Sequence, residues 1–471
     1  MTSESPSVHA PRSDSPRFTD LFRDGNAGAV GILAGGFLLA AITMFVTTAL
    51  MPSVVAEIGG RELYAWPTTI YVVVSIIGVM GVGQALARLG AVGAYLLAFA
   101  TYLVGGIVCT LAPTMPVLLA GRAVVGLGGG LLSGLGYALV RTVLPQRLWG
   151  MATGLISAMF GVGTLVGPVL GGLFAQFDAW RLAFAMIALA GLALGFVAPR
   201  ALRGHGRTGQ VEPFPLGSVA LLTAAVAALS VASITEGAAR VALLAAAAVL
   251  LVAFVAWDRR ARSSVLPDST YRPGSPMRWL MLTNAMLTIA VVSEAFTPLF
   301  GQSMAGLAPV VAGFFGAAVS VGWSFFGLLG ARAATPRSRS ALLIIGPGLL
   351  AAGFLGAALT QREPAGPGLA IVWFVLLVIA GAGIGFGFPV LSYATMSNVT
   401  DAAEAGKAAA TIPLVGLAAQ SLGAALAGVL VNAGLPSMPQ AAINLFVGLA
   451  VLAALGVVTA LAAVRRRAVA E

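Results

Sequence analysis

The sequence predicts an all-α integral membrane protein with fourteen transmembrane helices in two bundles of six and an inserted pair. The first observation is composition: 59% of the residues are apolar and only 9% are charged, against about 25% charged in soluble domains. The second is the length of the apolar runs. A bilayer core about 30 Å thick needs about 20 apolar residues per helix, and the runs meet that requirement.

The apolar runs fall into three groups that define the expected domains. A polar tail over residues 1–26 has the Ser, Pro, Asp and Arg content of a disordered segment. The N-terminal bundle, residues 27–199, has runs near 28–53, 67–87, 92–112, 116–140, 151–173 and 182–198. Residues 200–278 hold polar linkers around inserted helices near 216–234 and 240–257. The C-terminal bundle, residues 279–464, has runs near 279–301, 307–330, 341–360, 369–393, 407–432 and 441–464, before a basic tail over 465–471.

The arginines predict the orientation in the membrane. They cluster at 200–207, 259–262, 332–339 and 465–467, and all four clusters share one side if the chain crosses fourteen times. Basic residues favour the cytoplasmic side, so we expect both termini to be cytoplasmic and the protein to lie in the cell membrane. A single crossing by the inserted region would reverse every later cluster, so that region crosses twice or not at all.

The same residues exclude other classes of protein. The net charge of +10 comes largely from these interhelical arginines, so it is a topology signal and gives no support for nucleic-acid binding. One cysteine, Cys109, and two histidines in polar segments exclude a disulfide framework and make a metal site unexpected. We find no catalytic grouping and expect neither an enzyme nor a cofactor.

Two glycine-rich motifs stand inside the N-terminal bundle. The stretch GRAVVGLGGG (121–130) places Arg122 within the membrane, and GVGTLVGPVLGG (161–172) ends in a Gly-Pro element. Glycines remove side chains so that helices approach closely, and a proline deletes one backbone hydrogen bond and permits a bend. The positions that carry this second motif are Gly161, Gly167, Pro168, Gly171 and Gly172. Helix packing alone also explains each glycine taken singly.

These motifs, with AWPTTIYVV (65–73), DAWRLAF (178–184) and FTPLFGQSMAGLAPVVAG (296–313), resemble the major facilitator superfamily. The inserted helix pair is similar to its fourteen-span drug:proton antiporter branch. The resemblance implies two six-helix halves that rock around a central site, with hydrophobic small molecules and protons as partners. It also implies that Arg122 is a buried charge that hydrogen-bonds the first helix and couples protonation to substrate binding. The alternative is an arginine that snorkels to the membrane surface.

Two acidic positions of that family are missing here. In the loop GQALARLGAVG (83–93), Gly83, Arg88 and Gly90 keep the family pattern of the cytoplasmic gate, but Ala87 stands where an aspartate is usual. We therefore expect the charged latch of this gate to be weakened or rebuilt elsewhere. In the first helix Thr43 takes the place of an aspartate. Thr43 and Thr47 share one helix face and either line a cavity or pack against a neighbouring helix.

Glu294, in IAVVSEAFTPLF, is the one acidic residue well inside the fourteen candidate spans. A carboxyl group in a membrane is a candidate functional site, and burial favours its neutral form, so we interpret Glu294 as the proton-coupling residue. Two alternatives remain: a permanently protonated glutamate that only packs, for example against Thr297, and direct recognition of a cationic substrate.

The predicted substrate cavity contains few charges, which favours a hydrophobic or amphipathic molecule. Its candidate residues are Thr43, Thr47, Tyr71, Ser75, Tyr137, Trp323 and Gln420. The leading hypothesis is proton-coupled export of such molecules by a monomer. A transporter of lipids or lipid-like metabolites is the alternative, and a membrane scaffold or sensor without transport activity is a third.

Overall fold

A computed structural model describes residues 18–468 apart from 24, 61–62, 64–65, 205–214, 233–234, 236, 262, 308 and 400. Every element of the described chain is a helix. Of the tail expected to be disordered over residues 1–26, residues 1–17 lie outside the described residues, whereas residues 18–22 form a short 3-10 helix. The last three residues and most of the linker after residue 204 also lie outside the described residues.

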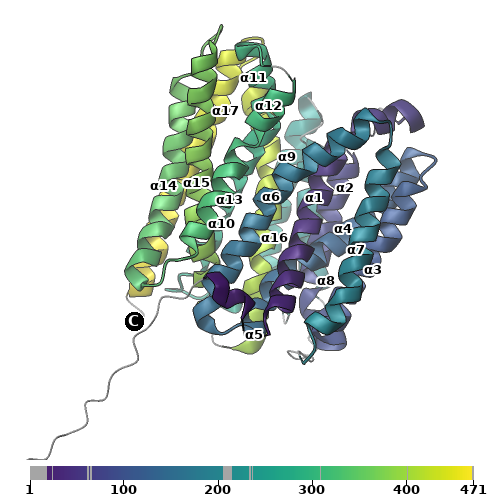
Figure 1. Ribbon diagram of the computed structural model, residues 1–471. Coiled ribbons are helices and arrows are strands. Elements are labelled where there is room, and N and C mark those ends of the chain that lie inside the picture. The colour runs from purple at the N-terminus through teal and green to yellow at the C-terminus, as the bar shows by residue number, and fades with distance from the viewer. Residues whose placement is uncertain are drawn as a thin grey trace, which may run out of the picture.

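The N-terminal half is a bundle of long helices (Figure 1). Its elements are η1 (Phe18–Phe22), α1 (Ala27–Ile58), α2 (Trp66–Met80), α3 (Val82–Thr110), α4 (Met115–Ala138), α5 (Val140–Val143), η3 (Gln146–Leu148), α6 (Trp149–Gln176) and α7 (Trp180–Ala201). Helix α1 packs against α6, α7 and α4, while α3 packs against α4 and α7. Proline at the start of α4, where no intrahelical partner is needed for its missing N–H, fits the chain's entry into that helix.

The inserted pair consists of α8 (Leu216–Ala232) and α9 (Gly237–Asp258), followed by η4 (Asp268–Thr270). These two helices pack on each other, and α8 also contacts α2 of one half and α16 of the other. The pair therefore lies along one side of the junction between the halves.

The C-terminal half forms the second bundle (Figure 1). Its elements are α10 (Met277–Thr288), η5 (Ile289–Ala295), α11 (Thr297–Ala305), α12 (Pro309–Gly316), α13 (Ala318–Gly330), α14 (Pro336–Leu359), α15 (Pro367–Ser397), α16 (Ala402–Asn432) and α17 (Met438–Ala468). The side chain of Thr335 accepts a hydrogen bond from the Ser338 N–H and so caps α14.

The helix count differs from the expectation. Ten described helices are long and apolar enough to cross a bilayer, or eleven if the bent pair of Met277–Ala295 and Thr297–Ala305 is one span. Three of the expected spans are represented only by shorter apolar helices, Trp66–Met80, Leu216–Leu229 and Ala318–Gly330. The count of fourteen is therefore not confirmed by length and composition.

Two of the predicted spans are broken. The run near 279–301 changes from α-helix to 3-10 helix at Ile289 and bends by 42° before α11. The run near 307–330 divides at Ala317 into α12 and α13. Helix α3 starts at Val82, ten residues earlier than the predicted run near 92–112. It turns sharply at Gly90, which has φ of 72°, a conformation that glycine adopts without steric cost.

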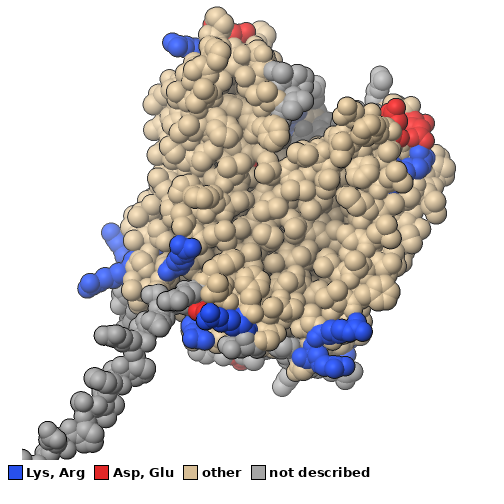
Figure 2. All heavy atoms as spheres, viewed as in Figure 1, with Lys and Arg blue, Asp and Glu red and all other residues tan. Residues whose placement is uncertain are grey.

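Charges gather at the two ends of the molecule. Figure 2 shows most Lys and Arg side chains at the end that carries α5, and a hollow between the two halves at the opposite end. At that opposite end, Glu57 of α1 accepts hydrogen bonds from the Trp180 indole, at 2.5 Å, and from the Arg181 guanidinium. These bonds tie α1 to α7.

Candidate functional site

A cavity lies where the two halves meet. Its lining comes from α1, α2, α4 and α6 on one side and α10, α13, α15 and α16 on the other. Five of the predicted residues contribute: Tyr71, Ser75, Tyr137, Trp323 and Gln420. The enclosed volume is about 70 Å³, smaller than the roughly 300–1,000 Å³ of small-molecule sites, so this conformation must widen to enclose a drug-sized ligand.

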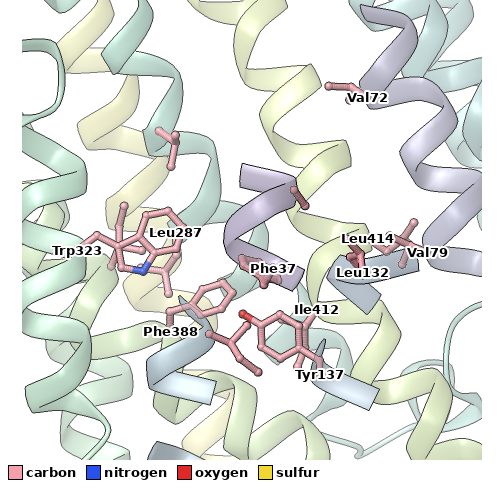
Figure 3. Packing of buried hydrophobic residues seen from close by; sticks show 14 of the residues in the cluster. Phe37, Val72, Val79, Leu132, Tyr137, Leu287, Trp323, Phe388, Ile412 and Leu414 are labelled. Carbon is pink, nitrogen blue, oxygen red and sulfur yellow. The ribbon is translucent and has the colours of Figure 1, made fainter. Parts of the chain in front are cut away.

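Aromatic rings from both halves form one wall of this cavity. Phe37 of α1 meets Tyr137 of α4 edge to face, with ring centroids 5.7 Å apart. Trp323 of α13 lies 5.0 Å from Phe160 of α6 and 5.8 Å from Phe388 of α15. Figure 3 shows Phe37, Tyr137 and Phe388 converging near Trp323. The three phenylalanines did not stand out in the sequence, because single phenylalanines are common in membrane helices.

Thr43 and Thr47 do not line the cavity. Each hydroxyl donates to a backbone carbonyl of its own helix, Thr43 to Leu39 at 2.7 Å and Thr47 to Thr43 at 3.0 Å. Both residues are fully buried in α1. The structure therefore places this pair in helix packing, one of the two readings that the sequence left open.

Arg122 is fully buried in α4. Its Nε donates to the Pro67 carbonyl of α2 at 3.1 Å, and its guanidinium lies 4.5 Å from the centre of the Tyr71 ring. The partner helix is therefore α2, and the expected direct bond to the first helix is wrong. Its two terminal nitrogens have no hydrogen-bond partner among the described residues. Burial also rules out an arginine that snorkels to the surface.

Tyr71 connects this arginine to α1 and to the cavity. Its hydroxyl donates to the Ala40 carbonyl at 3.0 Å and lies 3.3 Å from the Tyr102 hydroxyl. Ser75, one turn later, donates to the carbonyls of Tyr71 and of Gly126 in α4. Arg122 thus reaches the cavity through the ring of Tyr71.

Glu294 lies in η5, at the break in its span. Its Oε1 accepts a hydrogen bond of 2.9 Å from the Ser320 backbone N–H and one of 2.5 Å from the Ser320 hydroxyl. Ser320 is in the first turn of α13, whose free N–H groups give a partial positive charge. The Oε2 atom is buried and has no partner among the described residues. Glu294 does not line the central cavity.

Helix α13 links this carboxylate to the other half. Three residues after Ser320, the Trp323 indole donates to the Ser157 hydroxyl of α6 at 2.6 Å. Ser324 follows and approaches the Ala158 carbonyl at 3.4 Å. One short helix therefore carries the partner of Glu294, a cavity residue and a hydrogen bond between the halves.

The glycines of the α6 motif face two different neighbouring helices, α1 and α13. A Cβ built on Gly167 would lie 2.5 Å from that of Phe45, and one on Gly171 would lie 2.7 Å from that of Ala49, so these two face α1. Gly161 instead faces Ser320 and Ser324 of α13. Gly172 has open space around it. Pro168 lies within the continuous α6.

The predicted gate residues do not join the two halves. Arg88 is exposed, Gly83 has no heavy atom within 4 Å of a built Cβ, and Gly90 makes the turn in α3. Arg141 of α5 makes the connection instead, donating to the carbonyls of Met396 and, at 3.1 Å, of Val399. No pattern in the sequence indicates this role, because an arginine at a helix end is common.

Relatives of this chain are found among transport proteins. Residues 33–399 match the family described as "Major Facilitator Superfamily". The chain is 41% identical over 443 residues to a protein of Mycobacterium tuberculosis (strain ATCC 25618 / H37Rv) described as "Probable multidrug-efflux transporter Rv1634", covering 92% of this chain and 94% of the relative. It is 25% identical to "Multidrug resistance protein 3" of Bacillus subtilis (strain 168), over 79% of this chain and 72% of that protein.

Solved structures share the fold at low sequence identity. The human organic anion transporter MFSD10 (TETRAN) has a TM-score of 0.65 at 16% identity and covers 92% of this chain and 99% of its own. The proton:xylose symporter XylE has a TM-score of 0.63 at 16% identity, with coverages of 92% and 94%. Together with the family match over most of its length, the paired bundles identify this chain as a multi-pass membrane protein of the major facilitator superfamily.

Proposed function

We propose that this protein is a proton-coupled exporter of hydrophobic or amphipathic, drug-like molecules. In this proposal it belongs to the fourteen-span antiporter branch, works as a monomer by alternating access, and keeps both termini in the cytoplasm. The descriptions of its relatives as multidrug transporters support the substrate class. The basic residues at the end that carries α5 support the orientation.

The observation that carries the proposal is the contact between Glu294 and Ser320. Two donors and the N-terminus of α13 favour the ionised carboxylate, whereas the burial of its Oε2 atom opposes it. A group under two opposing influences of this kind changes its charge when its surroundings change. Glu294 is suited to proton exchange for this reason.

Protonation alters the attachment of α13. A neutral carboxyl accepts weaker hydrogen bonds than a carboxylate, so a protonated Glu294 holds the first turn of α13 less firmly. Trp323 on the same helix lines the cavity and bonds Ser157 of the other half. Proton binding therefore biases both the substrate site and the contact between the halves, which is the differential interaction that a population shift requires.

The cavity chemistry supports the substrate class. Its wall contains Phe37, Tyr137, Phe160, Trp323 and Phe388, and none of the described residues that line it is charged. Aromatic faces bind apolar molecules and also attract organic cations. Polar contacts are available from Ser133, Ser157 and Gln420.

Transport in proteoliposomes tests the proton-coupling residue. We expect Glu294→Gln to abolish uptake of a fluorescent hydrophobic cation driven by a pH gradient, while exchange of that cation across the membrane without a gradient continues. Glu363→Gln is the matched control, because Glu363 is exposed in the segment between α14 and α15. It should transport at the parental rate.

Two outcomes would contradict the proposed function or the role of Glu294 in it. Gradient-driven transport by Glu294→Gln at the parental rate would overturn the assignment of Glu294. Absence of both gradient-driven transport and exchange in the parent protein, for a panel of hydrophobic cations and neutral drugs, would overturn the proposed export function.

A further inference from the structure

A second cavity opens on the outer surface of the N-terminal half. It is a groove of about 570 Å³ between α3 and α7, helices that lie side by side at one edge of the molecule (Figure 1). Its lining on α3 includes Leu96, Phe99 and Leu103. This groove is far from the junction of the halves, and none of its residues lines the central cavity.

Two glycines of α7 line the groove and put no side chain into it. Gly191 and Gly195 lie there, and a Cβ on Gly195 would already be 3.5 Å from the Cβ of Phe99. The rims are formed by exposed apolar side chains, with Leu96 at 39% and Phe196 at 68% relative exposure. In a membrane helix such side chains face lipid tails, so the groove opens toward the acyl region of the bilayer.

One end of the groove is basic. Arg200, in the last turn of α7, and Arg203, which follows it, both belong to the lining. Both are exposed, and no carboxylate of the described residues forms an ion pair with either. Figure 2 shows a cluster of basic side chains at this end of the N-terminal half.

We propose that this groove binds an acidic phospholipid. One acyl chain lies between α3 and α7, and the headgroup phosphate binds Arg200 and Arg203. Guanidinium groups match phosphate oxygens in charge and geometry, and basic pockets between transmembrane helices are suited to anionic headgroups. The site goes beyond the transport function and does not depend on it.

The observations favour a lipid over other occupants. A free anion would use the arginines but leave the long apolar groove empty, whereas a transported hydrophobic molecule would use the groove but not the two unpaired cations. A second copy of the chain would have to place carboxylates against Arg200 and Arg203, yet the exposed residues of α3 and α7 that surround the groove are mainly apolar. A phospholipid with a net negative headgroup satisfies both ends.

Native mass spectrometry of the full-length protein tests the site. The purified protein is titrated with phosphatidylglycerol, phosphatidylcholine or inorganic phosphate, and bound molecules are counted. We expect the parent to retain one phosphatidylglycerol at lower concentration than phosphatidylcholine. Arg200→Gln with Arg203→Gln should weaken phosphatidylglycerol binding about 30-fold, at about 1 kcal/mol per basic residue.

Two further variants separate the alternatives. Arg332→Gln with Arg337→Gln removes the same charge from exposed arginines of the C-terminal half and should bind like the parent. Ala100→Phe fills the groove from an exposed position on α3 and should exclude the lipid while both arginines remain.

Four results would overturn the proposal. The first is equal binding of the two phospholipids by the parent, and the second is unchanged phosphatidylglycerol binding in the Arg200 and Arg203 double variant. The third is a parent dimer that Ala100→Phe dissociates without any loss of bound lipid, since a second copy would then occupy the groove. Phosphate binding in place of lipid would likewise contradict it.

Discussion

The carboxylate of Glu294 accepts a hydrogen bond of 2.9 Å from the backbone N–H of Ser320, at the start of α13. The two residues belong to different spans, and each lies beside a break in its own span. The proposed proton site is thus the contact between η5 and α13. This position connects a change of charge to the placement of α13.

Removing the Ser320 hydroxyl should weaken the contact between Glu294 and α13 without removing the carboxylate. Ser320→Ala loses the 2.5 Å bond to Glu294 but keeps the backbone N–H donor. A hydrogen bond to a charged group contributes about 1.5 kcal/mol or more, so we expect gradient-driven transport to fall about tenfold. Ser324→Ala, one turn later and bonded only at 3.4 Å to Ala158, should stay close to the parent rate. Equal rates for the two variants would remove Ser320 from the mechanism.

Arg141 should control how tightly the two halves close against each other at the end of the molecule that carries α5. Arg141→Gln loses the donor that binds the Met396 and Val399 carbonyls of the other half. We expect conformers open at this end to increase at least tenfold, since bonds from a charged donor contribute about 1.5–3 kcal/mol. Spin labels on Arg147→Cys and Arg337→Cys would report the separation, because the native Cys109 is buried.

Arg339→Gln is the control for that measurement. The Nε of Arg339 donates to the Ala333 carbonyl within its own half, at 3.0 Å, so its loss should leave the distance distribution unchanged. A parental distribution in Arg141→Gln would show that closure depends on helix packing alone.

Two glycines of the same motif should respond differently to a larger side chain. Gly167→Val would force α6 away from Phe45 and Val46 of α1, and overpacking of this kind costs about 1–3 kcal/mol. Gly172→Val adds the same atoms in open space. We expect a lower melting temperature and reduced transport for the first variant only, measured in detergent and in proteoliposomes. A similar loss in both would indicate a general intolerance of valine in this helix.

The hydrogen bonds that Glu57 accepts from Trp180 and Arg181 predict a pH dependence of stability. Hydrogen bonds from the Trp180 indole and the Arg181 guanidinium hold the pKa of Glu57 below its usual value. A group with a lowered pKa stabilises the fold above its unfolded-state pKa, about 4.3 for glutamate, and loses that contribution as the pH falls through the lower, folded-state pKa. The melting temperature of the parent should therefore exceed that of Glu57→Gln at pH 7, and the difference should shrink below about pH 4. A constant difference over this range would contradict the shift.

The helices were predictable because each depends on a local run of apolar residues. Part of the cavity was predictable for a similar reason, since Tyr71, Ser75, Tyr137, Trp323 and Gln420 stand out as polar or amphipathic residues inside such runs. Glu294 stood out as a charge in an apolar segment. Its isolation is visible in the sequence, but its partner is not.

The remaining contacts depend on geometry that no local pattern encodes. Ser320 meets Glu294 only because one span bends at η5 and the next divides at Ala317. Arg141 bridges the halves through carbonyl groups more than 250 residues away in the sequence, and backbone acceptors exist at every position. Thr43 and Thr47 look like cavity residues, but a threonine hydroxyl also bonds its own helix.

The separation of Glu294 from the central cavity has a consequence for how such a transporter diversifies. In the proposed mechanism the proton acts at the contact between η5 and α13, whereas the transported molecule contacts the side chains that line the central cavity. Substitutions at Phe37, Tyr137, Phe160 or Phe388 can then alter the range of accepted molecules and leave the proton site intact, whereas Trp323 belongs both to the cavity and to the helix that binds Glu294. Selectivity can evolve at those four phenylalanine and tyrosine positions without a change in the residue that exchanges the proton.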